Sequence, residues 1–219
     1  MSTASGPSTG PYPTARGLVA LCRDRSEAVA AAQRLAAAAQ RLGTTPTTGV
    51  TLHTAVEGHT GDWLAVIRAT GDPEDLADGL AGVSVVGVYE TTFRQVKAHE
   101  RTWAVGEATP GAGRLFAIVA HPRLTHAEFD AHWRDVHAPL ALQHHSAMWD
   151  YVQCSFDRPA TAGSAPFDGM AVCKFPTLED LKERFFDGPE AREVIGADVA
   201  RFTDVERSPA MRMTELVLA

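Results

Sequence analysis

Residues 114–121, with the sequence RLFAIVAH, restrict the fold more than any other part of the chain. In a strand, alternate side chains point to opposite faces, and both alternating sets are apolar in this segment. Both faces should therefore be buried. A four-stranded sheet that is covered by helices on one face only would leave its other face in water. The second face of this strand is therefore expected to pack against another sheet.

The elements that follow this strand predict a ferredoxin-like order. Thr125 and Glu128 fit a capping box at the start of a helix, which apolar residues at helical spacing continue to about Leu142. A second helical region is interrupted by Gly188 and Pro189. The predicted strands are 114–121, 147–156, 168–175 and 210–218, and the predicted helices are 125–142, 177–186 and 189–203. The order is strand, helix, strand, strand, helix, strand, with the second helix in two pieces.

The N-terminal half repeats this order less distinctly. Its predicted strands are 17–23, 48–56, 62–69 and 83–97, and its predicted helices are 26–42 and 72–80. A repeat of about 100 residues follows from this similarity.

The expected domains are a disordered tail at 1–16, a degenerate repeat at 17–97, a linker at 98–113 and a second unit at 114–219. The predicted fold class is α+β. Two ferredoxin-like units are expected to pack sheet to sheet as a pseudo-dimeric α/β barrel, with a cavity between the sheets.

The helix after strand 114–121 carries a recognisable motif. Residues 129–140 read FDAHWRDVHAPL, and the later positions Gly188, Asp198, Phe202 and Asp204 are spaced along a second helical segment. This pattern resembles the EthD family over about residues 113–219. The resemblance implies a dimeric α/β-barrel fold, found in cofactor-free polyketide cyclases and dehydratases, lactone isomerases, small monooxygenases and heme enzymes. Residues 25–33 of the first half lack the Trp and the His, which implies one such site per chain.

His137 is the first candidate for catalysis, and its side chain is expected to point into the cavity between the two sheets. Imidazole can take up and return a proton near neutral pH, which suits enolisation, dehydration or ring closure. The alternative is that His137 caps or bridges a buried backbone group near Pro139. His121, at the end of the first strand, is the second acid/base candidate because it is expected at the mouth of the barrel.

Four residues are candidates for contact with a substrate. Trp133 belongs either to the core or to the binding site. Trp149 and Tyr151 alternate on one face of the second strand, which fits a cavity wall or ordinary packing between the sheets. His144 lies on the same helix edge as His137, although it is expected at the exposed helix end together with His145.

Composition and spacing argue against several classes of partner. Histidines seven residues apart on a helix are about 10.5 Å apart, too far to share an ion, so neither a metal nor a cofactor is predicted. The net charge of −7 argues against nucleic acid, and no apolar run is long enough to cross a membrane. Three cysteines without metal or disulfide spacing favour a reducing compartment, and the cytoplasm is expected. The oligomeric state is left open, a homodimer included.

The predicted function is a cofactor-independent cyclase or dehydratase that acts on an aromatic or polycyclic, polyketide-like molecule. Two alternatives stay open. One is a cofactorless oxygenase of the same fold, in which the barrel deprotonates a phenol or anthrone that then reacts with oxygen. The other is a protein that binds a small molecule without converting it.

Overall fold

The computed structural model describes residues 10–41 and 49–219. The first nine residues of the expected tail lie outside these ranges, as do residues 42 and 48, which were expected to end a helix and begin a strand. In the N-terminal half the elements are β1 (Thr14–Cys22), α1 (Arg25–Arg41), β2 (Val50–Ala55), β3 (Ala65–Thr70), α2 (Pro73–Ala77), a 3-10 turn (Asp78–Leu80) and β4 (Val85–Lys97).

The C-terminal half has the same order of strands with more helix. Its elements are β5 (Ala112–Ile118), α3 (His126–His132), a π-helical turn (Trp133–His137), α4 (Ala138–His144), β6 (Asp150–Pro159), β7 (Gly169–Phe175), α5 (Leu178–Glu183), α6 (Pro189–Phe202), a 3-10 turn (Val205–Arg207) and β8 (Ala210–Val217).

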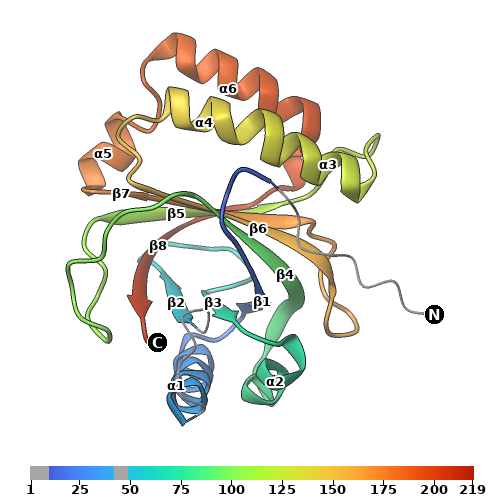
Figure 1. The fold of residues 1–219 in the computed structure, drawn as a ribbon, viewed down its shortest axis with the longest axis vertical. Coiled ribbons are helices and arrows are strands. Elements are labelled where there is room, and N and C mark those ends of the chain that lie inside the picture. Colours follow the sequence, from blue (N-terminus) through green and yellow to red (C-terminus); the bar gives the residue numbers. More distant parts are fainter. Residues whose placement is uncertain (1–9, 42–48) are drawn as a thin grey trace.

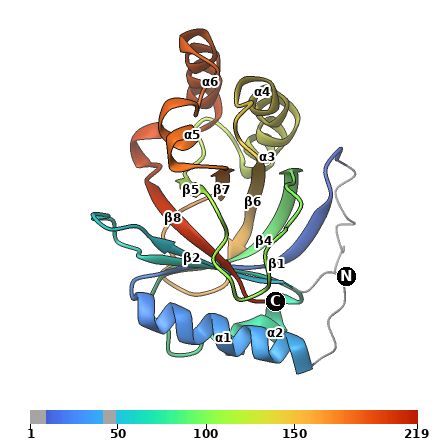
Figure 2. The same ribbon diagram turned by 90° about the vertical axis from the view of Figure 1, so that its left-hand side faces the viewer.

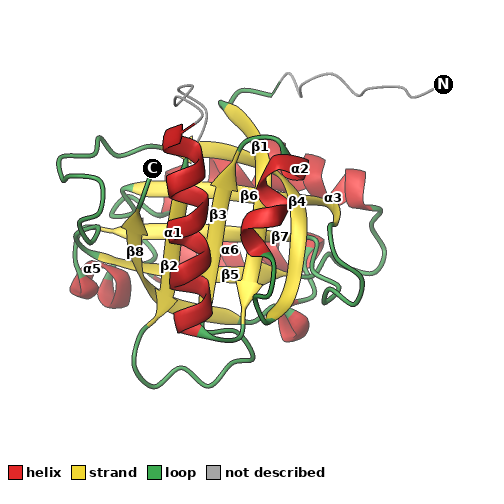
Figure 3. Ribbon diagram, turned by 90° about the horizontal axis from the view of Figure 1, so that it is seen from below, coloured by secondary structure: helices red, strands yellow, loops and turns green. Residues whose placement is uncertain are grey.

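The eight strands form a closed antiparallel barrel in the order β1-β3-β2-β8-β5-β7-β6-β4. Strands of the same half are neighbours, and the two halves are joined by the pairs β2–β8 and β4–β6. Figure 1 shows α1 and α2 on one side of the barrel and α3 to α6 on the other. Figure 2 shows the same layers after a quarter turn, and Figure 3 shows α1 and α2 lying across the strands of the first half.

The boundaries of two segments differ from those expected. Strand β1 begins at Thr14, three residues early, because Thr14 and Ala15 pair with Arg94 and Phe93 of β4. The segment between β4 and β5 is not a free linker, because the backbone N–H groups of Gly106 and Thr109 donate to carbonyls of β8 at 2.8 Å each. These contacts attach the segment to the barrel wall.

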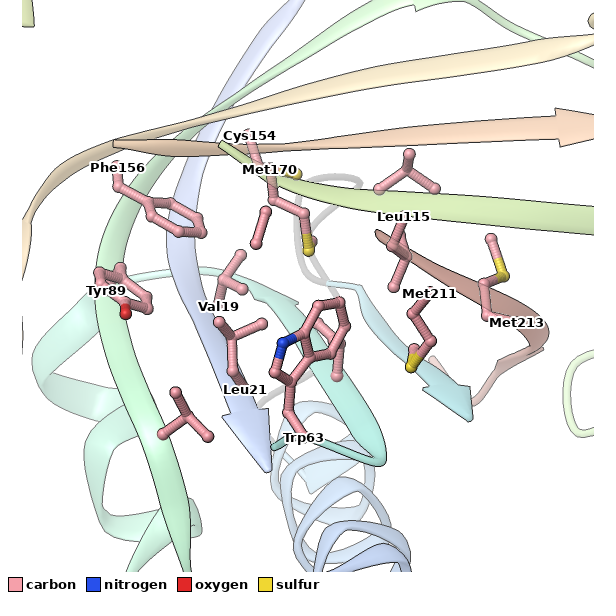
Figure 4. Close-up of a cluster of buried hydrophobic side chains, with 14 of the residues drawn as sticks. Val19, Leu21, Trp63, Tyr89, Leu115, Cys154, Phe156, Met170, Met211 and Met213 are labelled. Carbon is pink, nitrogen blue, oxygen red and sulfur yellow. The ribbon is translucent and has the colours of Figure 1, made fainter. Parts of the chain in front are cut away.

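Apolar side chains fill much of the space inside the barrel. Figure 4 shows Val19, Leu21 and Trp63 from the first half meeting Leu115 and Met211 from the second. Leu115 and Ala117 point into this interior, whereas Phe116 and Ile118 of the same strand face the helices. The two apolar faces of strand β5 are both used, as the sequence predicted.

Candidate functional site

A cavity of about 430 Å³ lies outside the barrel, between the sheet of the C-terminal half and its helices. This volume is within the usual range for small-molecule sites. Most of the wall is apolar or aromatic, with a few polar groups among these side chains. The wall includes Arg114, Phe116 and Ile118 of β5, Tyr151 of β6, Ala171 and Cys173 of β7, Trp133, His137, Ala141, His145 and Met148 around α4, and Phe185, Phe186, Ile195, Gly196 and Phe202 around α6.

A π-helical turn sets the first wall of the cavity. Helix α3 begins at the capping box of Thr125 and Glu128, which the sequence predicted. The turn then widens from Trp133 to His137, where Pro139 has no N–H to continue the α-helical pattern. Such π turns are frequent at functional sites. Trp133 and His137 both line the cavity as a result.

His137 is held by a buried carboxylate from the other helix. Its Nδ1 lies 2.9 Å from Oδ2 of Asp198 on α6, and Nε2 of His132 lies 2.8 Å from Oδ1 of the same residue. A carboxylate can only accept hydrogen bonds, so each of these ring nitrogens must carry the hydrogen. A neutral His137 then has its lone pair on Nε2, the form that a general base requires.

Asp198 is charged despite its burial. Only 3% of its surface is exposed, and burial alone would raise its pKa. The hydrogen bonds from His137 and His132 outweigh burial and hold the pKa of the Asp198 carboxyl below its usual value. The carboxylate therefore stays an acceptor for the N–H groups of both imidazoles.

Tyr151 supplies a hydrogen-bond donor to the same cavity. Its hydroxyl oxygen accepts from Nε1 of Trp133 at 3.1 Å and from Nε2 of Gln153 at 3.2 Å. Arg94 fixes the amide of Gln153 by donating to its Oε1 at 2.9 Å, which orients the other end of this amide toward Tyr151. Burial raises the pKa of Tyr151, so the phenol keeps its hydrogen. Within the described residues no hydrogen-bond acceptor is found for that hydrogen.

His145 is a second imidazole in the wall of the cavity. Its Nδ1 contacts the carbonyl oxygen of Phe185, and only 4% of the residue is exposed. Burial lowers its pKa, so this ring is neutral near pH 7. The expectation that His145 lies at an exposed helix end is therefore wrong, because its ring packs against Phe185 and Phe186 after α5.

Three of the six predicted site residues come together. His137, Trp133 and Tyr151 all line the cavity. His121 does not; its Nδ1 accepts from the backbone N–H of Arg123 at 3.2 Å and stabilises the loop before α3.

Trp149 and His144 also lie apart from the cavity. Trp149 precedes β6 and stacks on His99 of the segment between the halves, with ring centroids 4.1 Å apart. His144 is half-buried, and its carbonyl accepts from the backbone N–H of Asp187 at 3.0 Å.

The position expected for His137 is wrong in one respect. The sequence predicted that its side chain points into the space between the two sheets. It lies instead between the sheet and the helices, where it packs 5.0 Å from the ring of Phe202. The reason is that the helices hold the imidazole on the outer face of the barrel.

Sequence reasoning assigned no role to Asp198. Its position was noted only as part of the family pattern, and its partner lies 61 residues earlier in the chain. The available signal was an acidic residue within an otherwise amphipathic helical segment, four residues before Phe202. His145 was also missed, because no local pattern separates it from the adjacent His144.

Within residues 10–41 and 49–219, no three His, Cys, Asp or Glu side chains are grouped so that they could hold a metal ion. In the same part of the chain, no helix has the length and apolar character needed to cross a membrane.

The chain is thus an α/β-barrel protein with a cavity of small-molecule size beside its C-terminal half. Residues 121–206 match the EthD domain, so the C-terminal half carries an EthD domain, as the motif at 129–140 predicted. No curated protein sequence matches the chain.

Two solved structures have a similar fold. An anthrone oxidase-like protein is similar over 94% of this chain and 91% of its own, with 12% identity and a TM-score of 0.55. A proposed monooxygenase from Fusobacterium nucleatum is similar over 95% of this chain and 93% of its own, with 8% identity and a TM-score of 0.53. At these identities the likeness concerns the fold alone.

Proposed function

We propose that the protein is a cofactor-independent enzyme that dehydrates or cyclises an aromatic or polycyclic, polyketide-like molecule. The observation that carries this proposal is the imidazole of His137, held by buried Asp198 in the wall of an apolar cavity. Such a pair can move a proton within a site that excludes most water. The three unpaired cysteines support a place in the cytoplasm.

The proposed reaction begins with proton transfer from carbon. Nε2 of His137 takes a proton from a carbon next to a carbonyl group, and the electron pair of the C–H bond moves into the enolate. The Tyr151 hydroxyl donates a hydrogen bond to the enolate oxygen as charge develops there. In a dehydration, the imidazolium returns the proton to a departing hydroxyl group, which leaves as water. In a cyclisation, the enolate carbon attacks a second carbonyl, and the imidazolium protonates the resulting alkoxide.

The aromatic residues of the cavity favour a flat ligand. Phe129, Trp133 and Phe202 form one aromatic group behind His137, with ring centroids 5.4 to 5.8 Å apart. Phe116 and Phe185 form part of the opposite wall, with centroids 6.1 Å apart. Aromatic rings prefer offset or edge-to-face contact with one another, so a fused ring system fits this lining.

The proposal is tested by hydrogen exchange from 2-tetralone in D2O, a reaction that needs only a general base. 2-Tetralone is a bicyclic aromatic ketone with acidic hydrogens beside its carbonyl. We expect these hydrogens to exchange for deuterium faster with the protein than in buffer alone. Proton NMR monitors the loss of their signal. No acceleration by the folded protein would contradict the proposed chemistry. Oxygen uptake coupled to loss of ketone would instead indicate an oxygenase, and saturable binding without exchange would indicate a binding protein.

Gly196 allows the cavity to be filled without disturbing the fold. It lines the cavity from α6, and a Cβ added there would meet no atom within 4 Å. We expect Gly196→Phe to lower the exchange rate at least tenfold by occupying the site. The matched control Gly196→Ala should keep the rate and raise the free energy of unfolding, measured in urea, by roughly 0.5–1 kcal/mol. Equal exchange by both variants would place the reaction outside this cavity.

A further inference from the structure

The interior of the barrel is polar at the end where β1 starts and β4 stops. Three charged residues each lie two positions after an apolar residue of the barrel interior: Arg68 after Val66, Lys174 after Val172 and Glu215 after Met213. Because alternate residues share a face, these three charged side chains also point inward. His53 and Asp150 contact them from β2 and β6. We call His53, Arg68, Asp150, Lys174 and Glu215 the polar barrel cluster.

Lys174 forms ion pairs with both carboxylates of the cluster. Its Nζ lies 2.7 Å from Oε1 of Glu215 and 3.6 Å from Oδ1 of Asp150. The hydroxyl of Thr109 also donates to Oε1 of Glu215, at 2.9 Å. One ammonium group therefore lies between two anions, and Arg68 is the second cation of the cluster.

Arg68 has only part of its hydrogen-bonding capacity used. Its Nε donates to Nε2 of His53 at 2.8 Å. Among residues 10–41 and 49–219, its terminal nitrogens donate to no oxygen or nitrogen atom within hydrogen-bond distance: Nη2 lies 3.6 Å from Oε2 of Glu215, and the neighbouring thiol of Cys154 is only a weak acceptor. A guanidinium group carries five N–H donors, so most of them remain for another partner.

Two buried polar atoms of the cluster have no hydrogen-bond partner in the described part of the chain. They are Nδ1 of His53 and Oε2 of Glu215, which lie 3.6 Å apart. Buried polar groups that serve only to hold a fold together are nearly always paired. The unpaired atoms therefore favour a role in recognition for this end of the barrel.

A second cavity, of about 390 Å³, opens beside Arg68. Its apolar wall comes from Pro13, Ala15, Phe93 and Val152, and its polar wall comes from Thr51, Thr70, Gln95 and Arg68. No Asp or Glu is among its described lining residues. A ligand in this cavity would meet one cation, several neutral hydrogen-bonding groups and an apolar surface.

We propose that this second cavity binds a small organic monocarboxylate, with its two oxygens accepting hydrogen bonds from the terminal nitrogens of Arg68. The planar guanidinium matches the spacing of carboxylate oxygens and can bind them as a bidentate pair. Phe93 and Val152 then pack against the apolar body of the ligand. This site is distinct from the cavity at His137, since it lies inside the barrel and the other lies outside it.

Benzoate is the probe for this site, and benzamide is its neutral counterpart. By titration calorimetry, the full chain should bind benzoate with a Kd on the order of 1 mM or below, at least tenfold more tightly than benzamide. Arg68→Gln should weaken benzoate binding at least tenfold. Arg16→Gln, which removes an exposed arginine near the start of the neighbouring strand β1, should leave it unchanged. Benzoate binding that is equal in Arg68→Gln and the wild type would overturn the proposal, as would no binding to the folded wild type.

Two further variants locate the site if Arg68→Gln folds poorly. Ala15→Phe leaves Arg68 in place but fills the cavity, and it should also weaken benzoate binding at least tenfold. Gly196→Phe fills the other cavity and should have no effect on benzoate binding. The opposite result, with loss in Gly196→Phe and none in Ala15→Phe, would assign benzoate to the His137 cavity and overturn the proposal. Inorganic phosphate that binds as tightly as benzoate would also overturn it, because the apolar wall would then contribute nothing.

Discussion

The His137→Asn variant should exchange the acidic hydrogens of 2-tetralone roughly 10²–10⁴-fold more slowly than the wild type, the usual contribution of one general acid–base group. The asparagine amide cannot take up a proton near neutral pH, but it can still donate a hydrogen bond to Asp198. Folding should therefore be preserved. The rate is measured by proton NMR in D2O, with the free energy of unfolding in urea as the check on folding.

Two variants separate the role of His137 from a general effect of substitution. His144→Asn changes a half-buried histidine outside the cavity and should keep the wild-type rate. Asp198→Asn leaves one acceptor oxygen where two imidazoles now donate, so the ring of His137 should lose its fixed orientation and the exchange rate should fall. Asp198 is thus a positioning residue. If His137→Asn exchanges the hydrogens as fast as the wild type, a group other than His137 takes the proton. His145, the other imidazole in the cavity wall, would be the first candidate.

The barrel could be predicted because the strand segments show clear apolar alternation along the sequence. Phe116 and Leu115 lie on opposite faces of β5, and each face is buried against a different layer. The capping box at Thr125 predicted where α3 begins. Such features depend on neighbours along the chain, which periodicity records directly.

The site was harder to predict because it depends on contacts that periodicity does not record. A regular turn of 100° per residue placed His137 on one helix edge with His144, but the π turn at Trp133–His137 changes that phase. Asp198 reaches His137 across two helices, and its burial is tolerated only because two imidazoles donate to it. The polar barrel cluster likewise joins β2, β3, β6, β7 and β8, and no single segment shows it.

Acidification from pH 7.5 to pH 5.0 should lower the free energy of unfolding by about 2 kcal/mol through His53 alone. His53 is fully buried, and burial, reinforced by Arg68, lowers its pKa from 6.5 to about 3. In the unfolded chain this histidine takes up a proton below about pH 6.5, whereas in the folded protein it stays neutral until about pH 3. The unfolded state therefore gains about 1.4 kcal/mol for each pH unit below 6.5.

A histidine that gains an anionic partner on folding has the opposite effect: acidification then raises the free energy of unfolding. His126 is such a case, because the carboxylate of Asp168, 3.6 Å from its Nδ1, raises its pKa and stabilises the fold at low pH. His145 acts in the same direction as His53, since burial lowers its pKa. Burial alone would raise the pKa of Glu215, but His53, Lys174 and Arg68 hold it well below 4.5. Protonation of Glu215 therefore destabilises the folded protein mainly below pH 5. The interval from pH 7.5 to 5.0 therefore reports chiefly on histidines.

The His53→Gln variant isolates this contribution. The glutamine carbonyl can still accept from Nε of Arg68, so the variant keeps the hydrogen bond and removes the group that titrates. Urea unfolding at both pH values should show a loss on acidification that is about 2 kcal/mol smaller than in the wild type. His144→Gln removes a half-buried histidine from the same chain and should retain the wild-type difference. Equal losses in His53→Gln and the wild type would mean that His53 takes up its proton in the folded barrel as readily as in the unfolded chain. Arg68 would then lose an acceptor for Nε near pH 6, and the arrangement of the polar barrel cluster would itself depend on pH.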